Sequence, residues 1–363
     1  MRNLMDWAFK QADVTPKFTT QHCLAVRGGS CRACAETCPH DAITITRTVT
    51  IDPIECTGCG LCVAACPSFA LAPRGRAPVD RAVRCSEVAG EAPSVICLAR
   101  LQASDLVRMA AGGDVTLARA DCGGCEIGGP GVPAAVARTV AAASDLLALH
   151  GRTLALEIVE TERFDVPRDE RELSRRELLR GGWSQMRRSS GTLLAPLELL
   201  AESEPAPADR LALPVEHRRR MRTLELAKLE VEATVPLRLP EVLDGCILCP
   251  ACTRACPTNA IRRVFDGDAA GGARVELEAD RCVGCDACVD ACPVDVVRMR
   301  DDVQWGEFGG PTRIVYRAER PPAPLGAVPR AHETDAAVPG PATADDGPAT
   351  ADAGPASVDD DAS

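Results

Sequence analysis

Cysteine is the residue type whose spacing predicts chemistry in this sequence. The chain has 20 Cys among 363 residues, and most of them lie in tight clusters. Clustered thiols form disulfides, bind zinc or hold iron–sulfur clusters. Four segments share a Cys run, a Pro directly after its last Cys, and a short apolar strand. The runs are Cys31-x2-Cys34-x3-Cys38-Pro39, Cys56-x2-Cys59-x2-Cys62-x3-Cys66-Pro67, Cys246-x2-Cys249-x2-Cys252-x3-Cys256-Pro257 and Cys282-x2-Cys285-x2-Cys288-x3-Cys292-Pro293.

The spacing within these runs favours an iron–sulfur cluster over a zinc ion. Thiolates three residues apart lie on a tight loop that can wrap one corner of a cubane. Small residues such as Gly58, Gly60 and Gly284 let the backbone curl and bring its N–H groups toward the sulfurs. Zinc ribbons use two C-x2-C knuckles and need neither a third Cys nor the Cys-Pro ending. Disulfide scaffolds belong to an oxidising compartment and usually to short secreted chains.

The last three runs match in full the C-x2-C-x2-C-x3-C-P pattern of bacterial-type 2[4Fe-4S] ferredoxins. The chain resembles this family over about residues 20–72 and 242–300, as a polyferredoxin with two such modules. The resemblance implies low-potential one-electron carriers. It also implies that the fourth Cys of a run opens a short helical turn and points to the other cluster, and that the following Pro ends that turn.

This exchange of ligands predicts four [4Fe-4S] clusters. In the C-terminal module the expected sets are Cys246, Cys249, Cys252 and Cys292 for one cluster, and Cys282, Cys285, Cys288 and Cys256 for the other. In the N-terminal module Gly28 stands where the first run should begin, and we expect Cys23 to loop back in its place. The sets there are Cys23, Cys31, Cys34 and Cys66, and Cys56, Cys59, Cys62 and Cys38. If Cys23 cannot reach, its cluster is a three-iron form or is absent.

Between the two modules the apolar pattern predicts a β-α-β-α-β series. Strands are expected at residues 93–99, 114–120 and 153–159, and helices after the first strand and over residues 133–150. Such a series forms a parallel sheet, which binds ligands at the carboxyl ends of its strands. Cys97 closes the first strand, Cys122 and Cys125 follow the second, and Cys85 stands just upstream. We expect these four thiols to gather at one edge of the sheet.

Several uses remain open for the four central Cys. On a few residues, this region resembles the hydrogenase iron–sulfur (delta) subunit, which implies a [2Fe-2S] cluster. A [4Fe-4S] cluster or a zinc ion also suits four thiolates with one C-x2-C pair. A redox-active Cys122/Cys125 pair and buried structural thiols are the alternatives without a metal. We favour a metal or cluster at this place.

The whole pattern predicts an α+β chain in six parts. These are a lead (1–19), a ferredoxin module (20–80), an α/β domain (81–162), a charged helical connector (163–240), a second ferredoxin module (241–318) and a disordered acidic tail (319–363). In the connector, Ser174–Arg180 resembles a twin-arginine motif, although Ser174 and Glu177 also form a helix capping box, which we prefer. His217–Arg220 is expected to be a solvated basic helix face, with docking of an acidic partner as the alternative.

Composition excludes several classes of protein. A net charge of −11 and an aromatic content of 3% argue against nucleic-acid binding. The chain shows neither a signal peptide nor about 18 consecutive apolar residues, so we expect a cytoplasmic protein without a transmembrane segment. No dinucleotide fingerprint follows a strand, and the five His do not cluster with carboxylates, so no catalytic residue is assigned.

These patterns favour an electron carrier over an enzyme. It would relay electrons to or from a partner oxidoreductase, of the molybdopterin or hydrogenase type by resemblance. One alternative is an accessory or maturation ferredoxin for a molybdoenzyme. The other is a redox enzyme subunit that uses the central Cys set.

Overall fold

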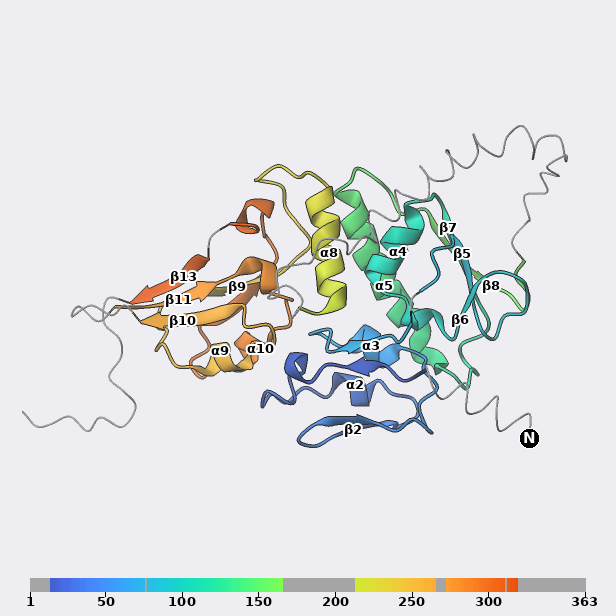
Figure 1. Cartoon of the computed structure of the whole chain (residues 1–363), viewed down its shortest axis with the longest axis horizontal. Coiled ribbons are helices and arrows are strands. Elements are labelled where there is room, and N and C mark those ends of the chain that lie inside the picture. The colour runs from blue at the N-terminus through green and yellow to red at the C-terminus, as the bar shows by residue number, and fades with distance from the viewer. Residues whose placement is uncertain (1–13, 76, 166–212, 266–271, 311, 319–363) are drawn as a thin grey trace, which may run out of the picture. The chain divides into compact units, whose positions relative to one another are not determined.

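The computed structural model describes residues 14–75, 77–165, 213–265, 272–310 and 312–318. These residues belong to one unit, Met1–Pro322 (Figure 1). The predicted helix at Ser174–Arg180 and the predicted acidic tail at 319–363 lie outside the described residues. Within the described ranges, no helix is both long and apolar enough to cross a membrane.

The N-terminal module is built from short strands and one-turn helices around the Cys runs. Its elements are β1 (Lys17–Phe18), α2 (Ala33–Glu36), β2 (Ile43–Ile45), β3 (Val49–Ile51), α3 (Leu61–Ala65) and β4 (Leu71–Ala72). Strand β1 pairs with β4, and β2 with β3, both antiparallel. A small core of Ile43, Val49, Val63 and Leu71 forms around Cys23 and Cys62. The apolar residues after each run therefore wrap the thiols.

The middle of the chain is a parallel sheet with helices, as predicted in outline. The strands are β5 (Ala82–Cys85), β6 (Ser94–Val95), β7 (Val115–Arg119) and β8 (Leu156–Glu160), in the order β6-β5-β7-β8. Helix α4 (Ala103–Ala110) ends before Gly112–Gly113, and α5 (Val132–Ala148) joins β7 to β8. The fully buried Val83, Val115 and Leu117 belong to the core that these helices share with the sheet.

One sequence prediction for this sheet is wrong in detail, and one strand was not predicted. The strand expected over residues 93–99 is extended only at Ser94–Val95, because Leu98–Arg100 turns into a 3-10 helix. Strand β5 was not predicted, although it lies between β6 and β7 and pairs with both. It is four residues long and contains Arg84, so it has no apolar run long enough to predict a buried strand.

Helix α8 (Val215–Leu226) lies against α4 and α5 (Figure 1). The expectation of a solvated face at 217–220 is wrong for His217, which is 2% exposed. Its Nε2 lies 2.7 Å from the carbonyl oxygen of Asp280, in the C-terminal module. Glu216 is buried as well and accepts the backbone N–H of Ser104 at 3.2 Å. The polar side of this helix therefore contacts other parts of the protein.

The C-terminal module repeats the plan of the N-terminal one with longer strands. Its elements are β9 (Leu239–Val242), α9 (Ala251–Ala255), β10 (Ile261–Phe265), β11 (Ala273–Leu277), α10 (Ala287–Asp290), β12 (Val297–Arg300) and β13 (Arg313–Ala318). Strand β9 pairs with β12, and β11 lies between β10 and β13, all antiparallel. In Figure 1 the short helices α9 and α10 lie close to these strands.

Candidate iron–sulfur centres

In each run a one-turn helix begins one residue before the next-to-last Cys and ends before the last Cys. The expectation that the fourth Cys opens a helical turn is therefore wrong. Helices α3 and α9 end at Cys66 and Cys256, whose own backbone is extended. The following Pro explains this ending, because it disfavours the helical conformation in the residue before it. The fourth Cys thus leaves its helix in an extended conformation.

A left-handed residue follows the last Cys of each run at the same distance. Three positions beyond it stand Asp41 (φ 50°), Phe69 (φ 53°), Asn259 (φ 54°) and Asp295 (φ 52°). In the second and third runs, the next backbone N–H donates to the cysteine sulfur: Ala70 N lies 3.2 Å from Cys66 Sγ, and Ala260 N lies 3.2 Å from Cys256 Sγ. Sequence reasoning missed this turn, although Asp and Asn at three of the four positions are typical of it.

Glycine supplies a second left-handed position in two of the runs. Gly58 (φ 71°) follows Cys56 by two residues, and Gly284 (φ 69°) follows Cys282 by two. Burial raises the pKa of Cys56, and the backbone N–H of Gly58 partly offsets that rise. Burial likewise raises the pKa of Cys282 to about 12, although the backbone N–H of Gly284 partly offsets the rise. These N–H groups would stabilise a thiolate at each position.

The N-terminal module brings Cys23 into the first thiol set. Burial raises the pKa of Cys34 to about 11, and the neighbouring charges that raise it further are those of Cys66, Cys31 and Cys23. Cys23 is buried in the same small core. We call Cys23, Cys31, Cys34 and Cys66 the Cys23 set. Cys34 is thus near enough to be affected by each of the other three, including Cys23, which lies outside the regular run.

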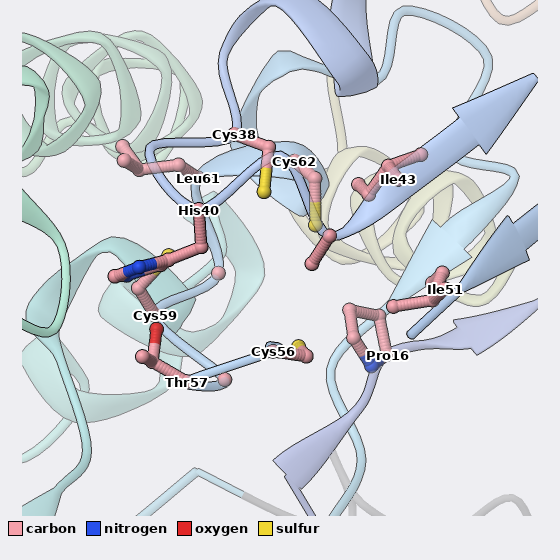
Figure 2. Close-up of a pocket in the computed structure, with 13 residues that line it drawn as sticks. Pro16, Cys38, His40, Ile43, Ile51, Cys56, Thr57, Cys59, Leu61 and Cys62 are labelled. Atoms are coloured by element: carbon pink, nitrogen blue, oxygen red, sulfur yellow. The ribbon is translucent and has the colours of Figure 1, made fainter. Parts of the chain in front are cut away.

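The second thiol set of this module lines a hollow. Burial raises the pKa of Cys62, and the charges of neighbouring Cys raise it further: Cys59, Cys56, Cys38 and, more weakly, Cys34. We call the first four residues the Cys56 set: Cys38, Cys56, Cys59 and Cys62. They line one pocket of about 340 Å³, open solvent included, together with Pro16, His40 and Ile43 (Figure 2). The effect of Cys34 on Cys62 also shows that the two sets adjoin.

The C-terminal module groups its eight thiols in the same way. Burial raises the pKa of Cys252 to about 11, and the charges of Cys246, Cys249 and Cys292 raise it further. These four residues, the Cys246 set, line a hollow of about 360 Å³. Burial also raises the pKa of Cys288, with further contributions from Cys282, Cys256 and Cys285, the other members of the Cys282 set.

The four central Cys lie at the carboxyl ends of neighbouring strands. Cys85 ends β5, Cys97 lies just beyond β6, and Cys122 and Cys125 lie beyond β7. Burial raises the pKa of Cys97 to about 12, and the charges of Cys59, Cys122 and Cys125 add to the rise. Burial also raises the pKa of Cys122, which Cys125 and Cys85 raise further. The structure therefore groups these thiols and places Cys97 beside Cys59 of the Cys56 set.

Gly128 lies at this contact between the middle domain and the N-terminal module. A Cβ atom built at Gly128 would lie 3.3 Å from Cys97 Sγ and 3.4 Å from Cys59 Cβ. The carbonyl of the preceding Ile127 accepts the Thr57 hydroxyl at 2.7 Å and lies 3.0 Å from His40 Nε2. The loop after Cys125 thus packs directly on the loop of the Cys56 set.

The four thiol sets of the two modules fit an iron–sulfur core. Each set brings four buried or half-buried thiols together, and their mutual repulsion favours the protonated form. A cationic iron core would relieve that repulsion, and the backbone N–H groups at Cys66 and Cys256 would stabilise the bound thiolates. As the side chains stand, no three His, Cys, Asp or Glu residues in the described part of the chain are arranged to hold a metal ion, in the module sets or in the central set. The fit to an iron–sulfur core therefore rests on the grouping of the thiols, their burial and the N–H donors.

Comparison with known families supports the two modules. The model of the 4Fe-4S dicluster domain matches residues 28–70 and 245–296. The matched segments include every Cys of the four sets except Cys23, and they leave out the central Cys set. Comparisons with curated proteins and with solved structures give no significant match. The resemblance to two-cluster ferredoxins is therefore confirmed: residues 28–70 and 245–296 match 4Fe-4S dicluster domains, in a chain that carries two such modules.

Proposed function

We propose that this chain is a polyferredoxin that carries four [4Fe-4S] clusters and exchanges single electrons with a partner oxidoreductase. The number four is supported by the grouping of 16 Cys into four sets, two in each module. A bound cluster supplies one-electron redox chemistry at a low potential. The protein supplies thiolates, N–H donors and an apolar cover, and each of these tunes the potential.

Adjoining sets within a module support the relay. Cys34 and Cys62 belong to different sets, and the charge of Cys34 raises the pKa of Cys62; in the other module the charge of Cys252 raises the pKa of Cys288 in the same way. Helix α3 contains Cys62 of the Cys56 set and ends at Cys66 of the Cys23 set. Helix α9 contains Cys252 of the Cys246 set and ends at Cys256 of the Cys282 set. A single element therefore fixes the distance between two centres.

Iron analysis with low-temperature EPR of the anaerobically purified chain tests this function. Four cubanes require about sixteen irons per chain and magnetically interacting signals on full reduction. Fewer than about eight irons in a well-folded preparation would contradict the proposal. Clusters that transfer readily to an immature molybdoenzyme would instead favour the accessory or maturation role.

We also propose that Cys85, Cys97, Cys122 and Cys125 hold a fifth centre, either a [2Fe-2S] or [4Fe-4S] cluster or a zinc ion. Their position at the carboxyl ends of β5, β6 and β7 supports this, since that edge of a parallel sheet binds ligands. The test is Cys122→Ser, with Ser86→Ala as a control on the same sheet edge. Loss of two or more irons, or of one zinc, only in Cys122→Ser is expected. Unchanged metal content with rapid alkylation of Cys122 would favour a thiol-based redox enzyme.

A further inference from the structure

The N-terminal and C-terminal modules contact each other through Arg27. Arg27 lies four residues after Cys23, and its guanidinium reaches two acceptors in the C-terminal module. Nη1 donates to the carbonyl of Arg254 at 3.0 Å, and Nη2 donates to Oδ1 of Asn259 at 3.3 Å. The two acceptors flank Cys256, one on each side along the chain. A single side chain thus joins the loop of the Cys23 set to a member of the Cys282 set.

Helix α8 makes a second contact between the same two sets. The guanidinium of Arg220 lies 5.0 Å from the centre of the Phe69 ring, and Phe69 is three residues beyond Cys66. One turn earlier, His217 Nε2 lies 2.7 Å from the carbonyl of Asp280, two residues before the first Cys of the Cys282 set. The helix therefore contacts the Cys23 set on one side and the Cys282 set on the other.

The backbone at Phe69 is unusual for its residue type. The equivalent positions in the other runs hold Asp41, Asn259 and Asp295, which tolerate the left-handed conformation, whereas a bulky aromatic residue adopts it at a cost. At Phe69 a guanidinium lies over an aromatic ring, and this cation–π contact is lost if Asn replaces the ring. At the equivalent position of the third run, Asn259 instead accepts a hydrogen bond from the guanidinium of Arg27.

We infer that Arg27 and the Phe69–Arg220 contact are positioning elements that hold the Cys23 set against the Cys282 set, so that these sets form the inner pair where the modules meet. The inference rests on the proposed function, because the sets matter as electron carriers only when they hold clusters. In this arrangement the four thiol sets of the two modules form one continuous row. The Cys56 set then lies at the outer N-terminal position, beside Cys97, and the Cys246 set lies at the other outer position.

Exposure of the outer C-terminal set agrees with this order. Ile247 follows the first Cys of the Cys246 set, Val294 follows Cys292 by two residues, and both line the hollow of that set. Their side chains remain 37% and 39% exposed, respectively. The Cys246 set thus opens to solvent through an apolar rim, whereas the Cys282 set faces Arg27 and α8.

The test compares the full-length, cluster-loaded protein with Arg27→Met, Phe69→Asn and the double variant. Phe69→Asn removes the ring without leaving Glu216, the buried partner of Arg220, unpaired, and Asn suits the backbone there. Arg47→Gln is the matched control, because it removes one positive charge from the exposed tip of the β2–β3 hairpin in the same module. The readouts are iron content, hydrogen exchange across residues 252–261, and microwave-power saturation of the EPR signals after full reduction.

We expect the double variant to retain its iron and to exchange amide hydrogens near Cys256 about tenfold faster, as expected for the loss of charge-assisted hydrogen bonds. Its EPR signals should saturate at lower power, because fewer reduced centres interact, and Arg47→Gln should match the native protein. Native-like exchange and saturation in the double variant would overturn the inference. Low iron in the native protein would instead contradict the proposed function, and the exchange comparison would still decide whether Arg27 joins the modules.

Discussion

The two dicluster modules reach the same grouping of thiols by different routes. In the C-terminal module, both runs are complete, and all eight Cys lie within the matched segment 245–296. In the N-terminal module, the first run lacks its first Cys, and Cys23 joins from outside the matched segment 28–70. The regular spacing is therefore one way of delivering a thiol to the set, and an upstream loop is another.

What the modules keep in common is the turn after the fourth Cys. All four runs have a left-handed residue three positions beyond that Cys, and in two of them the following N–H donates to its sulfur at 3.2 Å. The fourth Cys belongs to the set of the neighbouring run, so its sulfur must point away from its own run. We infer that the side-chain direction of the fourth Cys is constrained more tightly than the place in the sequence from which the first Cys comes.

The largest expected effect comes from removing the first ligand in each module. Cys246→Ser and Cys23→Ser should each convert one cubane to a three-iron form or lose it, a loss of about one to four irons from about sixteen. Metal analysis and EPR of the oxidised proteins would show this, with Ala25→Ser as the control in the Cys23 loop. If Cys23→Ser retains all its iron while Cys246→Ser does not, the N-terminal module lacks the substituted ligand.

Gly128 offers a way to disturb one module and leave the other unchanged. In Gly128→Ala the new methyl carbon would lie 2.5 Å from Val132 Cγ2 and close to Cys97 Sγ, so the contact with the Cys56 set must shift. Such overpacking costs about 1–3 kcal/mol of unfolding free energy.

Hydrogen exchange under native conditions should rise around Cys59 and Cys97 and stay constant in the C-terminal module. Gly131→Ala is the matched control, because its added carbon would meet Leu61 at an ordinary distance of 3.7 Å. Equal effects of the two variants would show that the close approach at Gly128 has no special weight.

Sequence patterns predicted the two dicluster modules and the parallel sheet better than the contacts between them. Cys spacing is local, so the runs and the parallel sheet followed from residues close together in the chain. The burial of His217 did not, because a basic stretch on a helix looks solvated until Asp280, 63 residues away, supplies its hydrogen-bond partner. Strand β5 was missed for a related reason: Arg84 interrupts its apolar pattern and bonds to the carbonyls of Val88 and Ala92.

Acid should loosen the contact of α8 with the C-terminal module more than its contact with the N-terminal module. Burial lowers the pKa of His217 below 6.5, and the charge of Arg220 lowers it further. The hydrogen bond to Asp280 and the charges of Asp280 and Glu216 offset only part of this decrease. The unfolded chain therefore binds the proton first, so this site stabilises the fold fully above about pH 6.5 and loses that stabilisation as the pH falls below it, by at most about 1.4 kcal/mol per pH unit.

Hydrogen exchange of α8 and of residues 279–282, corrected for the intrinsic effect of pH, should rise between pH 7.5 and 5.5. His217→Gln should keep the hydrogen bond to Asp280 and remove the pH dependence. The Phe69–Arg220 contact contains no group that titrates in this range, so the contact of α8 with the N-terminal module should change little. A pH response that persists in His217→Gln would assign it to another group.

The smallest expected effect concerns potentials within each module. The hydroxyls of Ser68 and Thr258 lie 3.8 and 3.7 Å from the sulfurs of Cys66 and Cys256, whereas Val294 occupies the equivalent position after Cys292. A hydrogen bond to sulfur stabilises the more negative, reduced state, so Ser68→Ala and Thr258→Val should lower one potential in their own module. A net hydrogen-bond contribution of about 0.5–1.5 kcal/mol corresponds to about 20–60 mV for one electron.

Redox titration monitored by EPR would measure these shifts, and Val294→Thr should give a shift of opposite sign in the Cys246 set. Because both hydroxyl contacts are long, we expect values near the lower limit of that range. The hydroxyls stand beside the fourth Cys of the two sets that meet between the modules, so they would raise the potentials of the inner pair relative to the outer sets. If Ser68→Ala and Thr258→Val leave the potentials unchanged, the backbone N–H groups of Ala70 and Ala260 alone tune these sulfurs.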